Sequence, residues 1–308
     1  MSTAKLNLET KLTFHNGDKM PQLGFGVYKS ERDVCEKSIA TALDAGYRHI
    51  DSAQYYENED LVGKAATSHS SIPRSELFLT TKTFNYSKGD TVESLLPGLI
   101  ESVKKMHPVK EGEQPYVDLF LIHAPSSGPE GRQTLWDAFQ ELKKQGYAKN
   151  IGVSNFGVKH LETLKGEKPV VNQIELHCFF QQRDITDYCA KNGKSQIPSD
   201  NVQAQILSSD VLLRTGIVVQ AYSPLVRMQK SEDPTLVKVA KEVGKEPTQV
   251  LIRWSLQKGF SPLPKSDTPS RIRQNADVYN FELSKEQMDT LDGLEAHFHV
   301  APWNVNCE

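Results

Sequence analysis

The sequence predicts an α/β protein in which eight parallel strands close into a barrel and a helix follows each strand. The chain has 308 residues, 38% of them hydrophobic and 24% charged, which is an ordinary globular composition. Short β-rich runs alternate with helical stretches, as they do in parallel sheets. Several runs are continuously apolar, as strands are when both of their faces are buried. We therefore predict a (β/α)8 barrel, or TIM barrel, as one domain over residues 1–308.

The predicted units can be placed in order along the chain. The strands are expected at 24–28, 49–53, 77–82, 118–123, 150–155, 170–176, 217–223 and 261–265. The helices are expected at 31–45, 57–68, 91–106, 131–145, 158–165, 182–191, 234–243 with 247–258, and 270–277. Eight such units fit a closed barrel better than an open, doubly wound sheet.

Further elements flank these units at both ends of the chain. Asn16-Gly17 lies between two extended runs, which is a strong signal for a β-hairpin. This N-terminal hairpin is expected to plug one end of the barrel. After the eighth unit, the run SKEQMDTLDGL predicts an additional C-terminal helix at 284–294, and a tail then continues to Glu308.

Residues 194–216 interrupt the pattern, because 23 residues stand where a helix-to-strand loop normally takes about 2–6. Codons for the residues at its two ends can contain splice-donor and splice-acceptor patterns. We therefore hypothesise a retained intron in a eukaryotic, fungal-type gene, with a true insertion as the alternative. Such a loop lies at the amino-terminal end of the strands, away from the expected chemistry.

Charge and cysteine content argue against several other classes of protein. Lys and Arg number 36 against 39 Asp and Glu, so a net charge of −3 offers no basic excess for nucleic acid. The four cysteines, at 35, 178, 189 and 307, lack metal-ligand spacing and are expected to be reduced thiols. The sequence shows no signal peptide and no apolar run of about 18 residues. We expect a cytoplasmic protein with no nucleic-acid or membrane partner and no bound metal.

Polar side chains stand near the carboxyl ends of successive predicted strands, where barrels of this kind hold their active sites. Strand two ends near Asp51, with Tyr56 five residues on, while strand three ends in Lys82 and strand four in His123. Each alone has an ordinary explanation, such as a helix cap, a solvated charge, a structural histidine or an exposed loop aromatic. At matching ends of the strands, however, they predict one polar cluster.

These four residue types permit one specific kind of chemistry. A tyrosine hydroxyl has a pKa of about 10, which is high for an acid near neutral pH, and a nearby ammonium lowers it. Asp51 can hold Lys82 charged beside Tyr56, and His123 can orient a carbonyl oxygen. The set suits protonation of a carbonyl oxygen while a nicotinamide cofactor supplies hydride, because no side chain can supply it.

Several long stretches, in the same order, resemble the aldo-keto reductase superfamily from about residue 12 to residue 303. They are GYRHIDSAQYYENEDLVG (46–63), LFLTTK, DLFLIHAP, NIGVSNF, VVNQIELH, VVQAYSPL and LPKSDTPSRIRQN (263–275). The resemblance implies a barrel with a hairpin across its base. It also implies a catalytic set of Asp51, Tyr56, Lys82 and His123, with Tyr56 as the acid in carbonyl reduction and the base in alcohol oxidation.

The resemblance further implies how NADPH/NADP+ is held. The positions that hold the nicotinamide carboxamide and stack on its ring are Ser154, Asn155, Gln173 and Tyr222. Those along the pyrophosphate and at the adenosine-phosphate end are Ser223, Leu225, Lys265, Ser266, Arg271, Gln274 and Asn275. The cations Lys265 and Arg271 suit a 2′-phosphate and favour NADPH over NADH. Gln274 stands where many relatives carry Glu, which alters the expected adenine contact.

Two residues of the expected substrate pocket depart from the family pattern. Relatives commonly have Trp at the positions of Tyr28 and Ala124. Loss of the indole at 124 should widen the pocket, so we hypothesise that bulkier carbonyl compounds are accepted. Trp303, in the tail, is either a lid over this pocket or a packed C-terminal aromatic.

The resulting interpretation is an NADPH-dependent reductase of aldehydes or ketones, acting on small molecules as a monomer or weak dimer. One alternative is a non-catalytic regulatory or structural protein that binds the cofactor on the same barrel. Another, a metal-dependent barrel hydrolase, would need clustered His and carboxylate ligands, and His123 has only Asp51 as a companion.

Overall fold

Eight parallel strands form the centre of the molecule in the computed structural model, which describes residues 5–69, 71–192 and 216–301. Each strand pairs with the next along the chain, as consecutive βα units require. The strands are β3 (Phe25–Gly26), β4 (His49–Asp51), β5 (Phe78–Thr83), β6 (Val117–Ile122), β7 (Ala148–Ser154), β8 (Val171–Glu175), β9 (Val218–Tyr222) and β10 (Ser261–Pro262). All six residues of β5 and of β6 are buried, as expected for strands covered on both faces.

The first and last strands meet, so the sheet closes into the predicted barrel. The backbone N–H groups of Gly24 and Gly26 donate to the carbonyls of Pro262 and Pro264, both at 3.1 Å. A Cβ atom at position 24 would lie 2.5 Å from Cδ2 of Leu263 and 2.7 Å from Nδ1 of His49, so a larger residue would have to displace these side chains. The regular strands are shorter than the predicted 24–28 and 261–265, because the two prolines have no N–H to extend the ladder.

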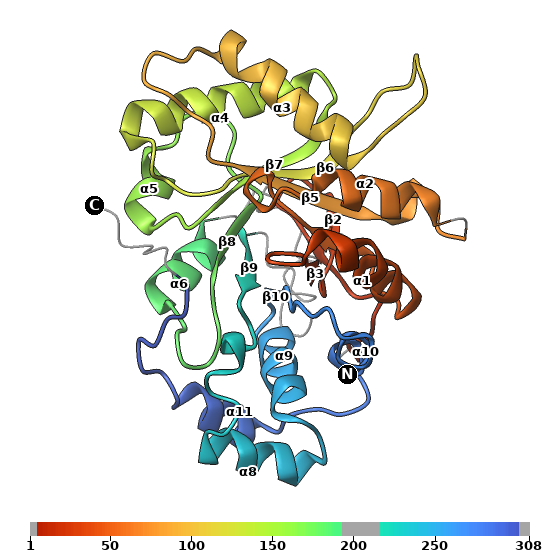
Figure 1. Cartoon of the computed structure of the whole chain (residues 1–308). Helices are drawn as coiled ribbons and strands as arrows, with labels where there is room; N and C mark the ends of the chain where they lie inside the picture. Colours follow the sequence, from red (N-terminus) through yellow and green to blue (C-terminus); the bar gives the residue numbers. More distant parts are fainter. Residues whose placement is uncertain (1–4, 70, 193–215, 302–308) are drawn as a thin grey trace, which may run out of the picture.

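Helices surround the barrel on its outside (Figure 1). They are α1 (Arg32–Asp44), α2 (Glu59–Ser68), α3 (Val92–Met106), α4 (Gly128–Lys144), α5 (Val158–Thr163), α6 (Arg183–Lys191), α8 (Pro234–Val243), α9 (Pro247–Gln257), α10 (Pro269–Ala276) and α11 (Lys285–Asp292). Three short 3-10 turns, η1 (Gln54–Tyr56), η2 (Arg74–Glu76) and η4 (Val226–Met228), lie in the connections. Local signals set several ends: Thr91 and Ser94 form a capping box at the start of α3, and Gly244 ends α8 at φ 65°.

The predicted hairpin closes the base of the barrel. Its strands are β1 (Lys11–Thr13) and β2 (Lys19–Pro21), which pair antiparallel with Leu12 opposite Met20. Phe14 and Met20 are buried against apolar residues near the amino-terminal ends of the barrel strands, including Phe78 and Val218. The plug leaves the carboxyl ends of the strands as the open end.

Almost all of the predicted insertion, 194–216, lies outside the described residues, and only its last residue is seen. The N–H of Ile217 donates to the carbonyl of Cys189 at 3.1 Å, and a Cβ atom on Gly216 would lie 2.5 Å from that oxygen. The chain therefore enters β9 beside the end of α6, at the base of the barrel. None of the helices in the described part of the chain is long and apolar enough to cross a membrane.

Candidate active site

A cavity of about 370 Å³ lies at the carboxyl ends of the strands. Many of the residues selected from sequence line it: Tyr28, Asp51, Tyr56, His123, Ser154, Asn155, Gln173, Tyr222, Ser223, Leu225 and Lys265. They come from most of the strands of the barrel and from the loops that follow them. The cavity thus has the position that active sites take in this architecture.

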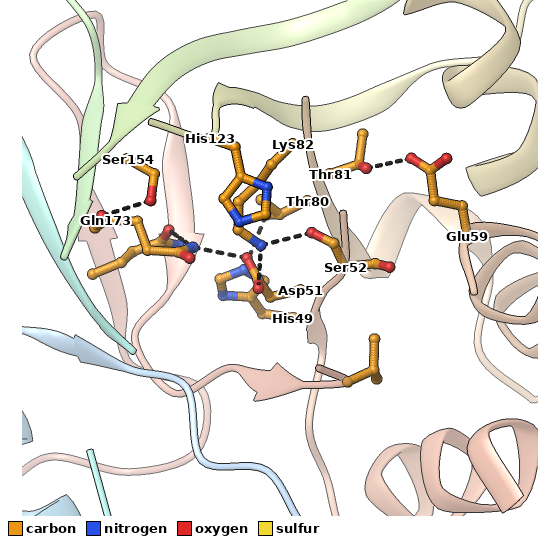
Figure 2. A network of polar contacts seen from close by, with 12 residues as sticks. His49, Asp51, Ser52, Glu59, Thr80, Thr81, Lys82, His123, Ser154 and Gln173 are labelled. Atoms are coloured by element: carbon orange, nitrogen blue, oxygen red, sulfur yellow. Dashed lines mark hydrogen bonds and ion pairs between the residues drawn. The ribbon is translucent and has the colours of Figure 1, made fainter. Parts of the chain in front are cut away.

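A buried ion pair lies at the cavity floor, where Asp51 is a lining residue and Lys82 is not. Nζ of Lys82, on β5, donates to Oδ1 of Asp51 on β4 at 2.6 Å and to the carbonyl of Ser52 at 2.7 Å (Figure 2). The Lys82 side chain is completely buried. Burial lowers the pKa of Lys82, and the attraction and hydrogen bond of Asp51 oppose that effect. The amine is therefore fixed in one position under the cavity.

The other oxygen of Asp51 is held as firmly. Nε2 of Gln173, on β8, donates to Oδ2 of Asp51 at 2.8 Å and to Oε1 of Gln220 on β9 at 2.9 Å. Gln220 in turn donates to the sulfur of Met20 in the plug at 3.1 Å. Sequence reasoning did not identify Gln220, since nothing in the pattern shows which polar side chain of a buried strand faces the barrel interior.

The Tyr56 ring lies among the other candidate catalytic groups. It sits at the end of η1, directly after β4, with Nζ of Lys82 4.8 Å from its ring centroid. The ring centroids of His123 and Tyr28 lie 5.7 Å and 4.9 Å away. Tyr56 follows Asp51 by five residues, and the turn after β4 brings its phenol ring back close to the ion pair.

The prediction that the nearby Lys82 leaves the Tyr56 hydroxyl with a lowered pKa is wrong for this structure. Burial raises the pKa of the Tyr56 hydroxyl well above its usual value, and the negative charge of Asp51 adds to the effect. Lys82 is paired with Asp51 at 2.6 Å, and its attraction does not outweigh these effects. The Tyr56 hydroxyl consequently keeps its proton at neutral pH.

His123 is a buried, neutral imidazole. Its ring stacks on Phe84 with centroids 4.0 Å apart and planes 11° from parallel. Burial and the nearby Lys82 hold the pKa of His123 well below its usual value. Within the described protein, its Nδ1 atom is buried with no hydrogen-bond partner. A neutral ring of this kind can donate a hydrogen bond without carrying a charge.

A preformed hydrogen-bond network lines one wall of the cavity. Asn155 donates through Nδ2 to the carbonyl of His123 at 2.9 Å and to Oγ of Ser154 at 3.1 Å, and it accepts from the Tyr222 hydroxyl at 2.8 Å. Oγ of Ser154 donates to the carbonyl of Gln173 at 2.8 Å. The backbone of Asn155 is left-handed, at φ 60°, which this network holds in place.

The residues expected at the adenosine end lie apart from this cavity, with one exception. Lys265 lines it and pairs with Asp267 at 2.5 Å, and that carboxylate also accepts from Ser30. Ser266 accepts from the N–H of Thr268 at 3.1 Å just before α10. Arg271, Gln274 and Asn275 lie on α10, where Arg271 is exposed, Gln274 is partly buried and Asn275 is buried.

Of the three residues expected in the substrate pocket, only one is seen to line the cavity in the described part of the chain. Tyr28 lines the cavity, Ala124 is buried and is not among the lining residues, and Trp303 lies outside the described residues. Sequence reasoning missed several lining residues: Gly26, Lys29, Tyr55, Pro224, Arg227, Met228, Leu263 and Ala301. Most are neighbours of residues that were selected, so proximity to a strand end was the available signal.

The hydrolase interpretation gains no structural support. Among the residues that the structure describes, no three His, Cys, Asp or Glu side chains are grouped so that they could bind a metal ion.

Comparison with known proteins agrees with this fold. Residues 22–296 match the Aldo/keto reductase family, so the chain belongs to that family of oxidoreductases. Over 300 residues it is 36% identical to glyoxal reductase of Bacillus subtilis, covering 96% of each chain. It is 35% identical to methylglyoxal reductase DkgA of Escherichia coli (strain K12) over 298 residues, covering 95% of this chain and 96% of that one.

A solved structure shows the same fold with a bound cofactor. A variant of Gox0644 in complex with NADPH superposes with a TM-score of 0.80 at 32% identity, covering 97% of this chain and 98% of that one. The (β/α)8 barrel predicted from sequence is therefore confirmed both by the strand pairing and by this likeness.

Proposed function

We propose that the protein is an NADPH-dependent carbonyl reductase that converts aldehydes or ketones to alcohols. One observation carries the proposal: Tyr56, His123 and the Lys82–Asp51 pair meet at one cavity at the open end of the barrel. A protonated phenol, a neutral imidazole and a buried ammonium together suit the transfer of a proton to a carbonyl oxygen.

The polar groups of the cavity wall fit a nicotinamide carboxamide. Gln173 donates both of its amide hydrogens within the protein, to Asp51 and Gln220, so its Oε1 is what remains to accept a hydrogen bond. Asn155 likewise uses both amide hydrogens internally, and its Oδ1 keeps a free lone pair. These acceptors, already oriented, would hold the amide –NH₂ group of the carboxamide.

The proposed reaction divides between cofactor and protein. When bound, NADPH would supply the hydride that the carbonyl carbon requires. Tyr56 donates its hydroxyl proton to the carbonyl oxygen, which becomes the alcohol, and the phenolate is then reprotonated from solvent. His123 donates a hydrogen bond that orients the carbonyl oxygen, and the Lys82 ammonium stabilises the phenolate as it forms. In the reverse direction the same phenolate would act as the base.

The preference for the phosphorylated cofactor rests on Arg271 more than on Lys265. The charge of Lys265 is compensated by Asp267 at 2.5 Å, whereas Arg271 is exposed on the first turn of α10. A guanidinium binds phosphate oxygens through paired N–H donors. We infer that Arg271 provides the main contact to the 2′-phosphate.

The substrate class follows from relatives and from the pocket. The relatives named above are reductases of glyoxal and methylglyoxal, which are small dicarbonyl compounds. Ala124, where relatives commonly carry Trp, is not among the lining residues, so the proposal that bulkier compounds are also accepted rests on the sequence alone. Comparing kcat/KM for methylglyoxal and for an aryl ketone tests this: strong preference for the small substrate would contradict it.

The proposed function is tested with the purified full-length chain. We expect NADPH absorbance to fall when an aldehyde is added, with one alcohol formed for each NADPH consumed. Fluorescence titration measures NADPH binding separately. Tight binding without turnover on any carbonyl compound would instead identify the non-catalytic, cofactor-binding alternative.

A further inference from the structure

A buried carboxylate, Glu175, holds the C-terminal tail against the cavity. It lies at the carboxyl end of β8 and is 1% exposed. Its Oε1 accepts from the N–H of Val300 at 2.6 Å, and its Oε2 accepts from the N–H of Ala301 at 2.9 Å. Two consecutive backbone groups of the tail are thus bound by the two oxygens of one side chain, more than 120 positions away in sequence.

The tail matters to the cavity because Ala301 forms part of its wall. Upstream of this point, Phe298 donates its N–H to the carbonyl of Phe179 at 3.0 Å, and Lys230 lies 4.2 Å from the Phe298 ring centroid. Those contacts fix the tail beside the loop after β8. Only the two bonds to Glu175 tie the described end of the tail to a barrel strand at the level of the cavity.

Other groups keep the carboxylate charged in its buried position. His177, itself 2% exposed, lies with Nε2 3.1 Å from Oε1 of Glu175 and acts as the donor, because a carboxylate can only accept. Burial would raise the pKa of Glu175, but the hydrogen bonds from His177 and from the two backbone groups outweigh it and lower the pKa. The charge is therefore stabilised mainly by the tail and by one histidine.

We propose that Glu175 is a positioning residue for substrate specificity. It fixes Ala301 as a wall of the cavity, and this wall allows the cavity to bind small carbonyl compounds tightly. The proposal rests on the carbonyl-reductase function proposed above. Glu175 touches none of the groups assigned to proton transfer, so its loss should change substrate binding and leave the chemical step nearly intact.

Glu175→Gln is the direct test, because glutamine has nearly the same shape but presents an –NH₂ group to one of the two tail N–H donors. We expect hydrogen exchange at the amides of Val300 and Ala301 to become about tenfold faster or more. We expect KM for methylglyoxal to rise about fivefold or more, while kcat and the NADPH dissociation constant change by less than about twofold. The ratio of kcat/KM for a bulky ketone to that for methylglyoxal should therefore increase.

A second variant and a control separate this effect from general loss of stability. Val300→Pro removes one tail donor without altering Glu175 or a lining residue, and it should reproduce the KM change and the faster exchange at Ala301. Asp118→Asn removes another buried carboxylate that accepts a backbone N–H, from Leu79 at 3.0 Å, but near the base of the barrel. The control should lower stability and leave both tail exchange and KM unchanged.

The outcomes are distinguishable. Unchanged exchange at Val300 and Ala301 in Glu175→Gln, or faster exchange with KM constant, would overturn the positioning role. An equal rise of KM in Asp118→Asn would also overturn it. If the wild-type chain reduces no carbonyl compound, the proposed function fails, while the exchange comparison still decides whether Glu175 holds the tail.

Discussion

The amine of Lys82 lies 4.8 Å from the ring centroid of Tyr56, below the floor of the cavity. The same amine is 2.6 Å from Oδ1 of Asp51. The ammonium is therefore paired in the resting protein, and Tyr56 keeps its proton. In the proposed reaction Tyr56 gives that proton away, and the negative charge that would appear beside Lys82 would be stabilised by the ion pair. This arrangement favours a donor that is protonated before the reaction.

Removing one partner of the buried ion pair should lower the stability of the folded protein. In Lys82→Met, Asp51 is left as a buried charge with only Gln173 as a donor from a side chain, so we expect a loss of about 3–5 kcal/mol in the free energy of unfolding. The double variant Asp51→Asn/Lys82→Met removes both charges and should recover much of this stability. Urea unfolding measures both.

Turnover separates the structural role of the pair from its chemical role. We expect kcat of the double variant to stay at least about 100-fold below the wild type, although its stability returns. Recovery of activity together with stability would show that the pair is needed only for folding.

Stability should fall as pH is lowered from about 6.5 to about 4. Burial lowers the pKa of His49 to about 3 and that of His107 to about 4, and it also lowers the pKa of His123. Unfolded histidines bind protons near pH 6.5, so in this range the unfolded state binds more protons and is favoured. Each histidine contributes a slope of up to about 1.4 kcal/mol per pH unit, and the full stability is present above pH 6.5.

A single substitution can test whether buried histidines cause this pH dependence of stability. His49→Gln should make the unfolding free energy less dependent on pH between 4 and 6.5. His297→Gln, which removes a largely exposed histidine, should leave the slope as in the wild type. Parallel pH profiles for the wild type and His49→Gln would contradict the assignment to burial.

Cofactor preference should depend on one cation of α10. Arg271→Ala is expected to weaken NADPH binding about tenfold or more, because a charge-assisted hydrogen bond is lost, and to change NADH binding by less than about twofold. Arg273→Ala is the matched control, since Arg273 lies on the same helix and donates to the carbonyl of Pro269. Equal losses for the two cofactors would place the 2′-phosphate elsewhere.

Removal of residues 194–216 should be tolerated. The described residues that flank it, Asn192 and Ile217, both lie at the end of α6, and β9 begins at the base of the barrel. Shortening such a loop changes the closure entropy little, so we expect kcat/KM within about threefold of the full-length chain.

Transcript sequencing tests the intron hypothesis independently: if no spliced form exists, the segment is a true insertion.

Much of the architecture was predictable because barrel strands carry a simple signal. Apolar runs such as 119–122 are buried on both faces, and Asn16-Gly17 marked the hairpin. The ends of the sheet were harder, because Pro262 and Pro264 accept hydrogen bonds but cannot donate them. That difference is invisible to a pattern based on hydrophobicity.

The site was predictable where position in a strand decides it, and not where distant segments meet. Asp51 and Lys82 could be selected as strand-end residues. The effect of burial on Tyr56 depends on its whole surroundings, so its direction was predicted wrongly. The contact of Glu175 with Val300 joins a strand to the tail and has no local sequence signal.

The most direct test of the central claim compares two neighbouring tyrosines. Tyr55 and Tyr56 line the same cavity, and Tyr55 is 56% exposed. The account predicts that Tyr56→Phe lowers kcat for an aldehyde at least about 100-fold while NADPH affinity stays within about twofold, and that Tyr55→Phe keeps kcat within about threefold. Undiminished turnover in Tyr56→Phe, or an equal loss in both variants, would contradict the assignment of Tyr56 as the proton donor.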